Sequence, residues 1–343
     1  MKKIILSGLI LATIGITIIG CNKEEVEIVD STNTNVMIHT ENEKSLDINN
    51  YSNISILNEV LTFRTFDSYT DIIDSDDENR VDFLIEHVNN LNFNSFSKVH
   101  PNSDLLERDE LLESILDENM IIKIDEWFIK INILDETVTA VSETEINAYE
   151  DLLSGQNRNI KIFSTGDDVI DHLQNNTSPD DRSCGGIGGG TYPSYSAPYN
   201  GQIIKTFSNG VVWRLNPYVH FFRAGIWFRL SSQYEVHRYP TSSSTSGGQV
   251  VSNITSENIT IEMFIRSPKA WWKRRPCNSS SIGTKNSGFH YSDSVHGHGK
   301  KTIYGGIRNL NGYYLYVQGR ARYSNGTVTT ASPYGGRNIN SPY

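Results

Sequence analysis

The feature that most constrains the fold of this chain is a change in the sign of its net charge near residue 180. Through Asp180 the chain holds 12 Lys and Arg against 35 Asp and Glu, whereas from Asp181 onward it holds 18 against 5. The formal charges of the two parts are therefore −23 and +13, which gives the net −10 of the whole chain. This asymmetry predicts two units with different surfaces, and the basic unit is suited to hold an anionic ligand or to dock on the acidic one.

The acidic part has the pattern of a small α+β domain, which we place at residues 51–176. Thr65 or Asp67 is expected to cap a first helix that runs through Tyr69, Ile72 and Ile73. Apolar residues at helical spacing predict two more helices, over Val81–Leu91 and Leu105–Leu116. A period of two predicts short strands at Val60–Phe63, Ile122–Ile124, Trp127–Ile133, Val138–Val141 and Ile160–Phe163. Ser142 and Glu145 match a capping box, so we expect a further helix from Glu145 to Leu153.

The basic part has an all-β pattern, which predicts an antiparallel sandwich-like domain at residues 201–343. Three Asn-Gly pairs, which begin at Asn209, Asn311 and Asn325, lie between β-branched or aromatic residues and predict hairpin turns. Residues 177–200 between the two domains are rich in Gly, Ser and Pro and are interpreted as a linker. Their glycine run is not followed by a helical pattern, so it does not predict a phosphate-binding loop.

The first twenty residues predict an export signal. Lys2 and Lys3 precede an apolar run, Ile4–Ile19, which is shorter than the roughly 20 residues of a membrane-spanning helix. Residues Ile18–Cys21 resemble the lipobox of bacterial lipoproteins. The resemblance implies cleavage before Cys21 and acyl chains on that cysteine as the membrane anchor. Residues 21–50 are rich in Asn, Thr, Glu and Ser and show no sustained period, which predicts a flexible stalk. The alternative is an ordinary cleaved signal peptide with a chance cysteine.

Two further stretches carry a resemblance to lipoproteins of Bacteroidota. Asn22–Glu25 is similar to the acidic tether that follows the lipidated cysteine in surface-exposed members. The stretch from Leu57 to Leu173, together with Arg223–Leu230 in the basic part, resembles uncharacterised lipoproteins, which likewise carry a basic β-rich C-terminal part. These resemblances imply an outer-membrane lipoprotein, periplasmic or surface-exposed, but they imply no activity.

Lipidation of Cys21 would leave Cys184 and Cys277 as the remaining cysteines of an exported chain. We expect a disulfide between them, because exported proteins form such bonds in an oxidising compartment. It would close a loop of about 94 residues and contribute roughly 4 to 5 kcal/mol by loop-closure entropy. Two free thiols are the alternative, because the sequence does not show whether the cysteines lie close together.

The most conspicuous candidate for ligand binding is a run of aromatic and basic residues, joined by two arginines on a later strand: Trp271, Trp272, Lys273, Arg274, Arg275, Arg320 and Arg322. Exposed indoles stack on sugar rings, and guanidinium groups bind carboxylate, sulfate or phosphate, so this set predicts a surface for a glycan or an anionic polymer. The alternative is that one tryptophan is core, the other covers an edge, and the cations are solvated or pair with the acidic domain.

The sequence gives little support for an enzyme. It contains neither Gly-x-Ser-x-Gly nor a recognisable catalytic cysteine signature, so we expect no catalytic residues and no cofactor. The nearest approach to a metal site is His290, His296 and His298 with Asp293, but a Gly-rich loop that happens to hold three histidines is the favoured interpretation. We expect no nucleic-acid partner, because a lipid-anchored exported protein rarely meets one.

The resulting hypothesis is a lipid-anchored, non-enzymatic envelope protein whose β-rich domain binds a glycan or anionic polymer. A structural or protein-interaction lipoprotein, in which the basic domain contacts the acidic domain or a partner protein, is the alternative. A metal-dependent hydrolase at the three histidines is the third hypothesis.

Overall fold

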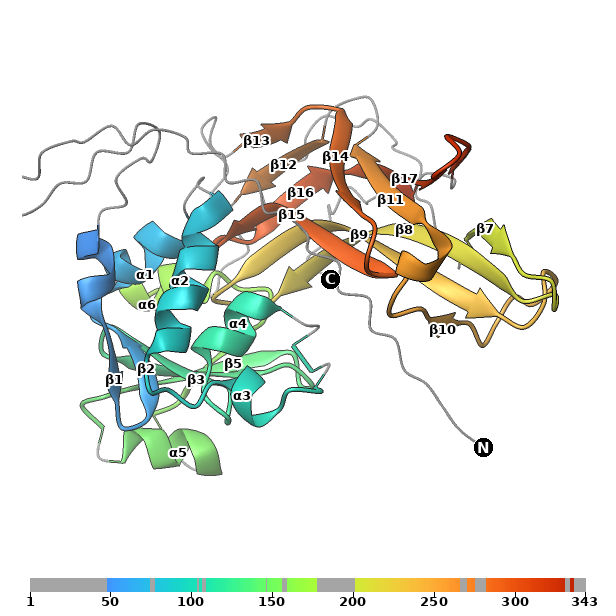
Figure 1. Cartoon of the computed structure of the whole chain (residues 1–343). Coiled ribbons are helices and arrows are strands. Elements are labelled where there is room, and N and C mark those ends of the chain that lie inside the picture. Colours follow the sequence, from blue (N-terminus) through green and yellow to red (C-terminus); the bar gives the residue numbers. More distant parts are fainter. Residues whose placement is uncertain are drawn as a thin grey trace, which may run out of the picture. The chain divides into compact units, whose positions relative to one another are not determined.

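The computed structural model describes residues 48–74, 78–103, 105–106, 109–145, 147–155, 159–177, 201–265, 270–274, 282–330 and 334–335. These residues belong to one compact unit, Asp47–Tyr343. Its fold is mixed α+β with a β-rich C-terminal region, as predicted (Figure 1). The predicted signal peptide, Cys21, Cys184, Cys277 and Arg275 lie outside the described residues. Among the helices that the structure describes, none has the length and apolar character needed to cross a membrane.

The N-terminal α+β region is built on one six-stranded sheet in which the strands follow chain order. The strands are β1 (Ile54–Leu57), β2 (Val60–Phe63), β3 (Ile121–Ile124), β4 (Trp127–Asn132), β5 (Thr137–Ser142) and β6 (Lys161–Ser164). The β2–β3 pair is parallel, whereas the other neighbouring pairs of this sheet are antiparallel. Between β2 and β3 the part of the chain that the structure describes forms α1 (Phe66–Ile73), α2 (Glu78–Asn90), α3 (Phe96–Val99) and α4 (Glu110–Ile115). Two more, α5 (Ala148–Ser154) and α6 (Val169–Gln174), flank β6, and a short 3-10 helix, Ile48–Asn53, precedes β1.

The two faces of this sheet are covered unequally. On one face, Phe63, Ile122 and Ile129 join the main core together with apolar residues of α1, α2 and α4. On the other face, Val60, Ile121 and Phe128 pack with Ala148 and Leu152 of α5 in a small separate core. Figure 1 shows α1, α2 and α4 on one side of the sheet and α5 on the other.

The helix ends of this region partly follow the predictions. Thr65 caps α1, because its hydroxyl accepts the Ser68 N–H at 3.0 Å while the Ser68 hydroxyl accepts the Thr65 N–H at 3.1 Å. The predicted capping box at Ser142 and Glu145 is wrong. The Ser142 hydroxyl instead bonds the Thr144 hydroxyl at 2.9 Å, and α5 begins three residues after Glu145.

The predicted helix over Leu105–Leu116 is also shorter in the structure. Helix α4 begins at Glu110, where the Asp109 carboxylate accepts the Leu112 N–H at 3.1 Å and caps the first turn. The Asp109 cap fixes the start of α4 at Glu110, although the apolar residues at helical spacing begin earlier, at Leu105.

The described residues of the C-terminal β-rich region form three sheets. The first has the order β10-β9-β8-β7 with β15 also on β9, and it consists of β7 (Gln202–Thr206), β8 (Val212–Arg223), β9 (Phe228–Tyr239), β10 (Gln249–Val250) and β15 (His298–Gly306). The second has the order β14-β11-β17-β18 with β19 also on β17, and it consists of β11 (Ile259–Ile265), β14 (Gly288–Asp293), β17 (Tyr316–Tyr323), β18 (Val328–Thr330) and β19 (Tyr334–Gly335). The third consists of β13 (Ile282–Lys285), β12 (Ala270–Arg274) and β16 (Leu310–Tyr314).

A second hydrophobic core lies between the first two of these sheets. It contains Leu215, Leu230 and Val236 from the first sheet and Ile261 and Val317 from the second. Strand β11 buries every second residue, as the alternation in its sequence predicts. Two packed sheets with alternating inward residues confirm the expected sandwich-like architecture.

Two of the three predicted Asn-Gly turns are confirmed. Gly210 and Gly326 have positive φ angles of 85° and 83° in the β7–β8 and β17–β18 connections, where glycine relieves the strain of that conformation. The prediction at Asn311 is wrong, because Asn311 and Gly312 lie inside β16, where Gly312 is paired with Lys273 of β12. Strand pairing with β12 outweighs the local turn preference there.

The two predicted domains share the larger hydrophobic core. Phe222, Ile226 and Trp227 of the β8–β9 hairpin join the core of the α+β region, as does Ile307 after β15. Within that core, the Tyr69 hydroxyl donates to the Ile226 carbonyl at 3.0 Å. Residues on either side of the predicted linker are therefore packed together in this core, while the β-rich region also has the second core of its own.

Candidate functional site

The two tryptophans of the predicted ligand-binding surface lie on opposite faces of β12. Trp272 packs against the second core, and its ring centroid lies 6.1 Å from that of Tyr304. It also covers Gly283 of β13 so closely that a Cβ on this glycine would lie 2.1 Å from the indole Cε2. Because side chains alternate along a strand, the Trp271 indole lies on the outward face, beside Thr284 and Tyr314 on the neighbouring strands.

The basic residues of the same prediction are dispersed. Arg274 at the end of β12 forms an ion pair with Asp74, which follows α1, with 3.4 Å between Nη1 and Oδ2. Arg320 and Arg322 lie on β17, in a different sheet from the tryptophans. Arg322 donates two hydrogen bonds to the Glu262 carboxylate, from Nε at 2.7 Å and from Nη2 at 3.1 Å. The Arg320 guanidinium lies 4.2 Å from the centre of the Phe264 ring.

These positions divide the predicted set of residues. Trp272 belongs to the core, Arg274 pairs with the acidic region, and Arg322 is neutralised by a neighbour. What remains on the outward face of the β12–β16 pair is Trp271 with Tyr314 and Lys273, and Lys273 makes no ion pair with any described residue. We call these three residues the β12 surface.

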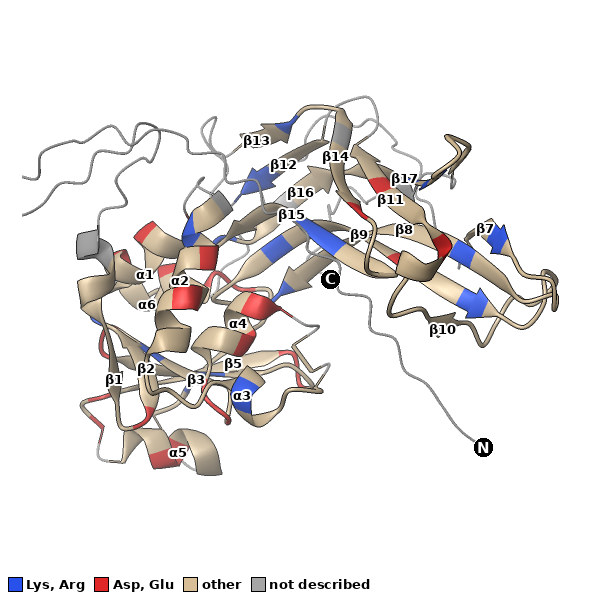
Figure 2. Cartoon of the chain, viewed as in Figure 1, with Lys and Arg blue, Asp and Glu red and all other residues tan. Residues whose placement is uncertain are grey.

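The basic residues of the β-rich region meet the acidic region at several further points. The Asp109 carboxylate accepts hydrogen bonds from Trp227 Nε1 at 3.1 Å and from the Arg229 guanidinium. The Arg229 and Asp109 side chains are only 3% and 2% exposed. Figure 2 shows acidic residues on α1, α2 and α4 and basic residues on β9, β12 and β15. Basic residues of the β-rich region therefore pair with acidic residues of the α+β region in the same chain. This pairing was one of the alternatives that the sequence left open for these charges.

A second polar contact joins the loop after β15 to the start of α6. The Asn309 N–H donates to Asp168 Oδ1 at 2.5 Å, and the Asn309 amide donates to the Gly166 carbonyl at 2.5 Å. One turn further along α6, Arg308 Nη1 lies 3.3 Å from Asp171 Oδ1. Asp168 is the N-cap residue of α6, but its side chain makes no cap hydrogen bond because it binds Asn309 instead.

The candidate metal ligands do not assemble into a site. His296 Nδ1 lies 3.1 Å from Asp293 Oδ2, and the two rings of His296 and His298 are 6.2 Å apart. Burial raises the pKa of Asp293, but hydrogen bonds from the N–H groups of His296 and Val295, together with the His296 ring, outweigh it and lower this pKa overall. Within the ranges that the structure describes, no group of three or more His, Cys, Asp or Glu is placed to hold a metal ion.

A polar cluster of Glu235, His237 and Tyr218 was not predicted from the sequence. Glu235 on β9 lies 2.6 Å from His237 Nε2, and its other oxygen accepts the Tyr218 hydroxyl at 3.2 Å. The hydrogen bond from His237 lowers the pKa of Glu235, and the same bond raises the pKa of His237. The spacing of two on one strand predicts that these side chains share a face, but only the pairing of β8 with β9 brings Tyr218 to them.

Comparison with known proteins adds no family. The chain matches no protein-family model and no curated protein.

Proposed function

We propose that this chain is an exported, lipid-anchored protein of the bacterial outer membrane, periplasmic or surface-exposed, with no catalytic activity. The order of Lys2 and Lys3, the apolar run Ile4–Ile19, Gly20 and Cys21 supports export and acylation. Several acyl chains on one cysteine would hold the protein stably, whereas a single chain anchors weakly.

The anchor is tested by metabolic labelling with palmitate in a host that acylates lipoproteins. Label should enter the full-length chain and should be absent from Cys21→Ser, while Cys184→Ser serves as the matched control and keeps it. An unlabelled wild-type chain would overturn the proposed anchor.

The activity that we propose is glycan binding by the β12 surface. The position of the half-buried Trp271 on the outward side of β12 is the observation that carries it, because the accessible part of an indole offers a flat apolar surface for a sugar ring. Tyr314 on the paired strand extends this platform, and the Lys273 ammonium at its edge favours a glycan that carries negative charge. Binding should weaken only slightly as salt rises, since Arg274 and Arg322 are already paired.

A glycan array that includes neutral and sulfated glycans tests this activity on the full-length chain in detergent. We expect binding to fall at least tenfold in Trp271→Ala and to fall for charged glycans alone in Lys273→Ala. Arg322→Ala, which removes a paired arginine from another sheet, should bind like the wild type. An array without any binding, or binding that is unchanged in Trp271→Ala, would contradict the proposal.

The alternative function is that of a structural or protein-interaction lipoprotein of the envelope. It is favoured by the buried pair of Arg229 with Asp109 and by the packing of Trp227 into the core of the α+β region. These contacts make the basic region a docking partner of the acidic region. Under this alternative Trp271→Ala leaves all glycan binding unchanged, and crosslinking on intact cells joins the chain to another envelope protein.

A further inference from the structure

The strongest unassigned feature of the molecule is a polar cavity on the outer face of the six-stranded sheet. Helix α5 covers only one end of this face, where it packs on Val60 and Ile121. Two residues further along the same strands, Thr62 and Lys123 are paired with each other across β2 and β3, and Thr62 is paired with Ser55 of β1. No residue of α5 lines the cavity at this second position, which has a volume of about 430 Å³.

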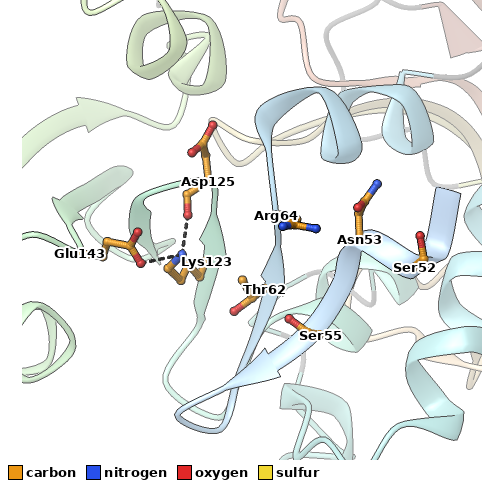
Figure 3. A pocket seen from close by; sticks show the side chains of 8 residues that line it. All are labelled: Ser52, Asn53, Ser55, Thr62, Arg64, Lys123, Asp125 and Glu143. Carbon is orange, nitrogen blue, oxygen red and sulfur yellow. Dashed lines mark hydrogen bonds and ion pairs between the residues drawn. The ribbon is translucent and has the colours of Figure 1, made fainter. Parts of the chain in front are cut away.

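The lining of this cavity is entirely polar, as Figure 3 shows. It is formed by Ser52, Asn53, Ser55, Thr62, Arg64, Lys123, Asp125 and Glu143. Binding sites for apolar molecules are lined mainly by hydrophobic and aromatic side chains, which are absent from this lining. Hydroxyl and amide groups instead match a ligand that carries many hydroxyl groups.

The charges around the cavity leave one cation available. Lys123 is buried and its ammonium is held by Glu143 Oε2 at 2.9 Å and by the Asp125 carbonyl at 2.5 Å. The exposed Arg64 guanidinium, in contrast, makes no ion pair with any described residue. In Figure 3 it points toward Asn53, whereas the Asp125 carboxylate points away from the hydroxyl groups of Thr62 and Ser55.

A planar guanidinium donates two parallel hydrogen bonds to a carboxylate, and this geometry binds more strongly than a point charge. The same fork also fits a phosphate. However, the lining carries two acidic side chains, Asp125 and Glu143, against two basic ones, so a group with a single negative charge is tolerated better than a phosphate dianion.

We propose that this cavity binds a small hydroxylated carboxylate of the sugar-acid class. Arg64 holds the carboxylate, and the hydroxyl and amide groups of Ser55, Thr62 and Asn53 hold the sugar hydroxyls. The Lys123–Glu143 pair joins the end of β3 to the residue that follows β5, and it supplies no net charge to the ligand. The site lies in the acidic region and does not depend on the glycan-binding role of the β12 surface.

Calorimetric titration of the full-length chain in detergent with galacturonate and glucuronate tests the proposal. We expect saturable binding of at least one uronate, and binding of galactose, glucose and inorganic phosphate that is at least tenfold weaker. Arg64→Gln should lower uronate affinity at least tenfold, and Arg64→Lys should lower it less because the charge remains. The control is Arg238→Gln, an exposed arginine on β9, which should bind like the wild type.

Three results would overturn the proposal. The first is an absence of uronate binding by the wild type. The second is unchanged affinity in Arg64→Gln, with an unfolding midpoint equal to that of the wild type. The third is phosphate binding as tight as uronate binding, which would mark a general anion site. Trp271→Ala should leave uronate binding intact, so failure of this site and failure of the β12 surface are distinguished.

Discussion

Asp109 and Arg229 form a buried ion pair between residues that lie 120 positions apart in the chain. The pair joins the N-cap of α4 to β9, and the Trp227 indole donates to the same carboxylate oxygen at 3.1 Å. Asp109 thereby caps the start of α4 and links this helix to β9. A buried charge that loses its partner is costly, so this pair makes the packing of the two regions specific.

The first prediction concerns this pair. Arg229→Met leaves the Asp109 carboxylate buried without its cation, and we expect the free energy of unfolding to fall by about 3 to 5 kcal/mol. Arg322→Met removes an exposed pair and should cost much less than Arg229→Met, because solvent screens the charges of an exposed pair. Urea denaturation of both variants measures the difference. Equal losses of unfolding free energy in the two variants would show that burial does not make the Asp109–Arg229 pair more costly to break than an exposed pair.

The second prediction concerns the packing of Trp272 on Gly283. A Cβ at residue 283 would lie 2.1 Å from the indole, so Gly283→Ala must displace the ring and should destabilise the protein by about 1 to 3 kcal/mol. Gly166→Ala is the control, because its nearest neighbours would lie 3.6 Å away and its φ angle is not positive. Thermal unfolding followed by near-ultraviolet circular dichroism measures both. A neutral Gly283→Ala would show that Trp272 is free to move.

The third prediction concerns pH. The hydrogen bond with Glu235 raises the pKa of His237 from 6.5, so the stabilisation from this imidazolium is fully present below pH 6.5 and is lost as pH rises through the raised pKa. The pKa of Glu235 is lowered from 4.5, so its stabilisation is present above pH 4.5 and is lost as pH falls through the lowered pKa. The pair is therefore most stabilising at mildly acidic pH.

His237→Gln tests this pH dependence, because glutamine keeps a hydrogen-bonding group but carries no charge. The difference in unfolding free energy between wild type and variant should be greatest near pH 6 and should shrink above the raised pKa of His237. Urea denaturation across the range from acidic to alkaline pH gives this difference. A difference that stays constant over that range would contradict the assigned pKa shifts.

The fourth prediction concerns Cys184 and Cys277, which lie outside the described residues. If they are bridged, the unfolded exported chain has no thiol that reacts with a maleimide until a reductant is added. Breaking the bridge in Cys184→Ser should cost about 4 kcal/mol by the loop-closure estimate. Mass spectrometry after maleimide treatment, with and without reductant, checks the pairing, and two modified thiols in the unreduced chain would exclude it.

Local pattern predicted much of the secondary structure but not the ends of the helices. The alternation of Ile259, Ile261, Met263 and Ile265 predicted both a strand and its buried face, because strand periodicity depends only on neighbours along the chain. The helix start at Asp109 and the lost capping box at Ser142 were missed. Several residues can accept a helix N–H, and the one that does so is chosen by tertiary contacts.

The candidate site was predicted only in part. One alternative from the sequence was that one tryptophan is core and the other covers an edge, but the sequence did not show that Trp272 is the one that packs on the core. It also did not reveal that Arg274 reaches Asp74, 200 residues away, or that Glu262 neutralises Arg322 across a strand pair. The polar cavity at Arg64 left no local signal, because its lining comes from three separate stretches of the chain.

The sequence by itself determined the mixed α+β class, the β-rich C-terminal region and the separation of acidic from basic residues, since each of these depends on composition or on a short period. The tertiary structure alone decided that the two regions share a core and that Arg229 and Arg274 pair with acidic residues. Burial and ion pairing depend on distances between residues far apart in the chain. Those distances are set when the sheets and helices pack, and no local pattern encodes them.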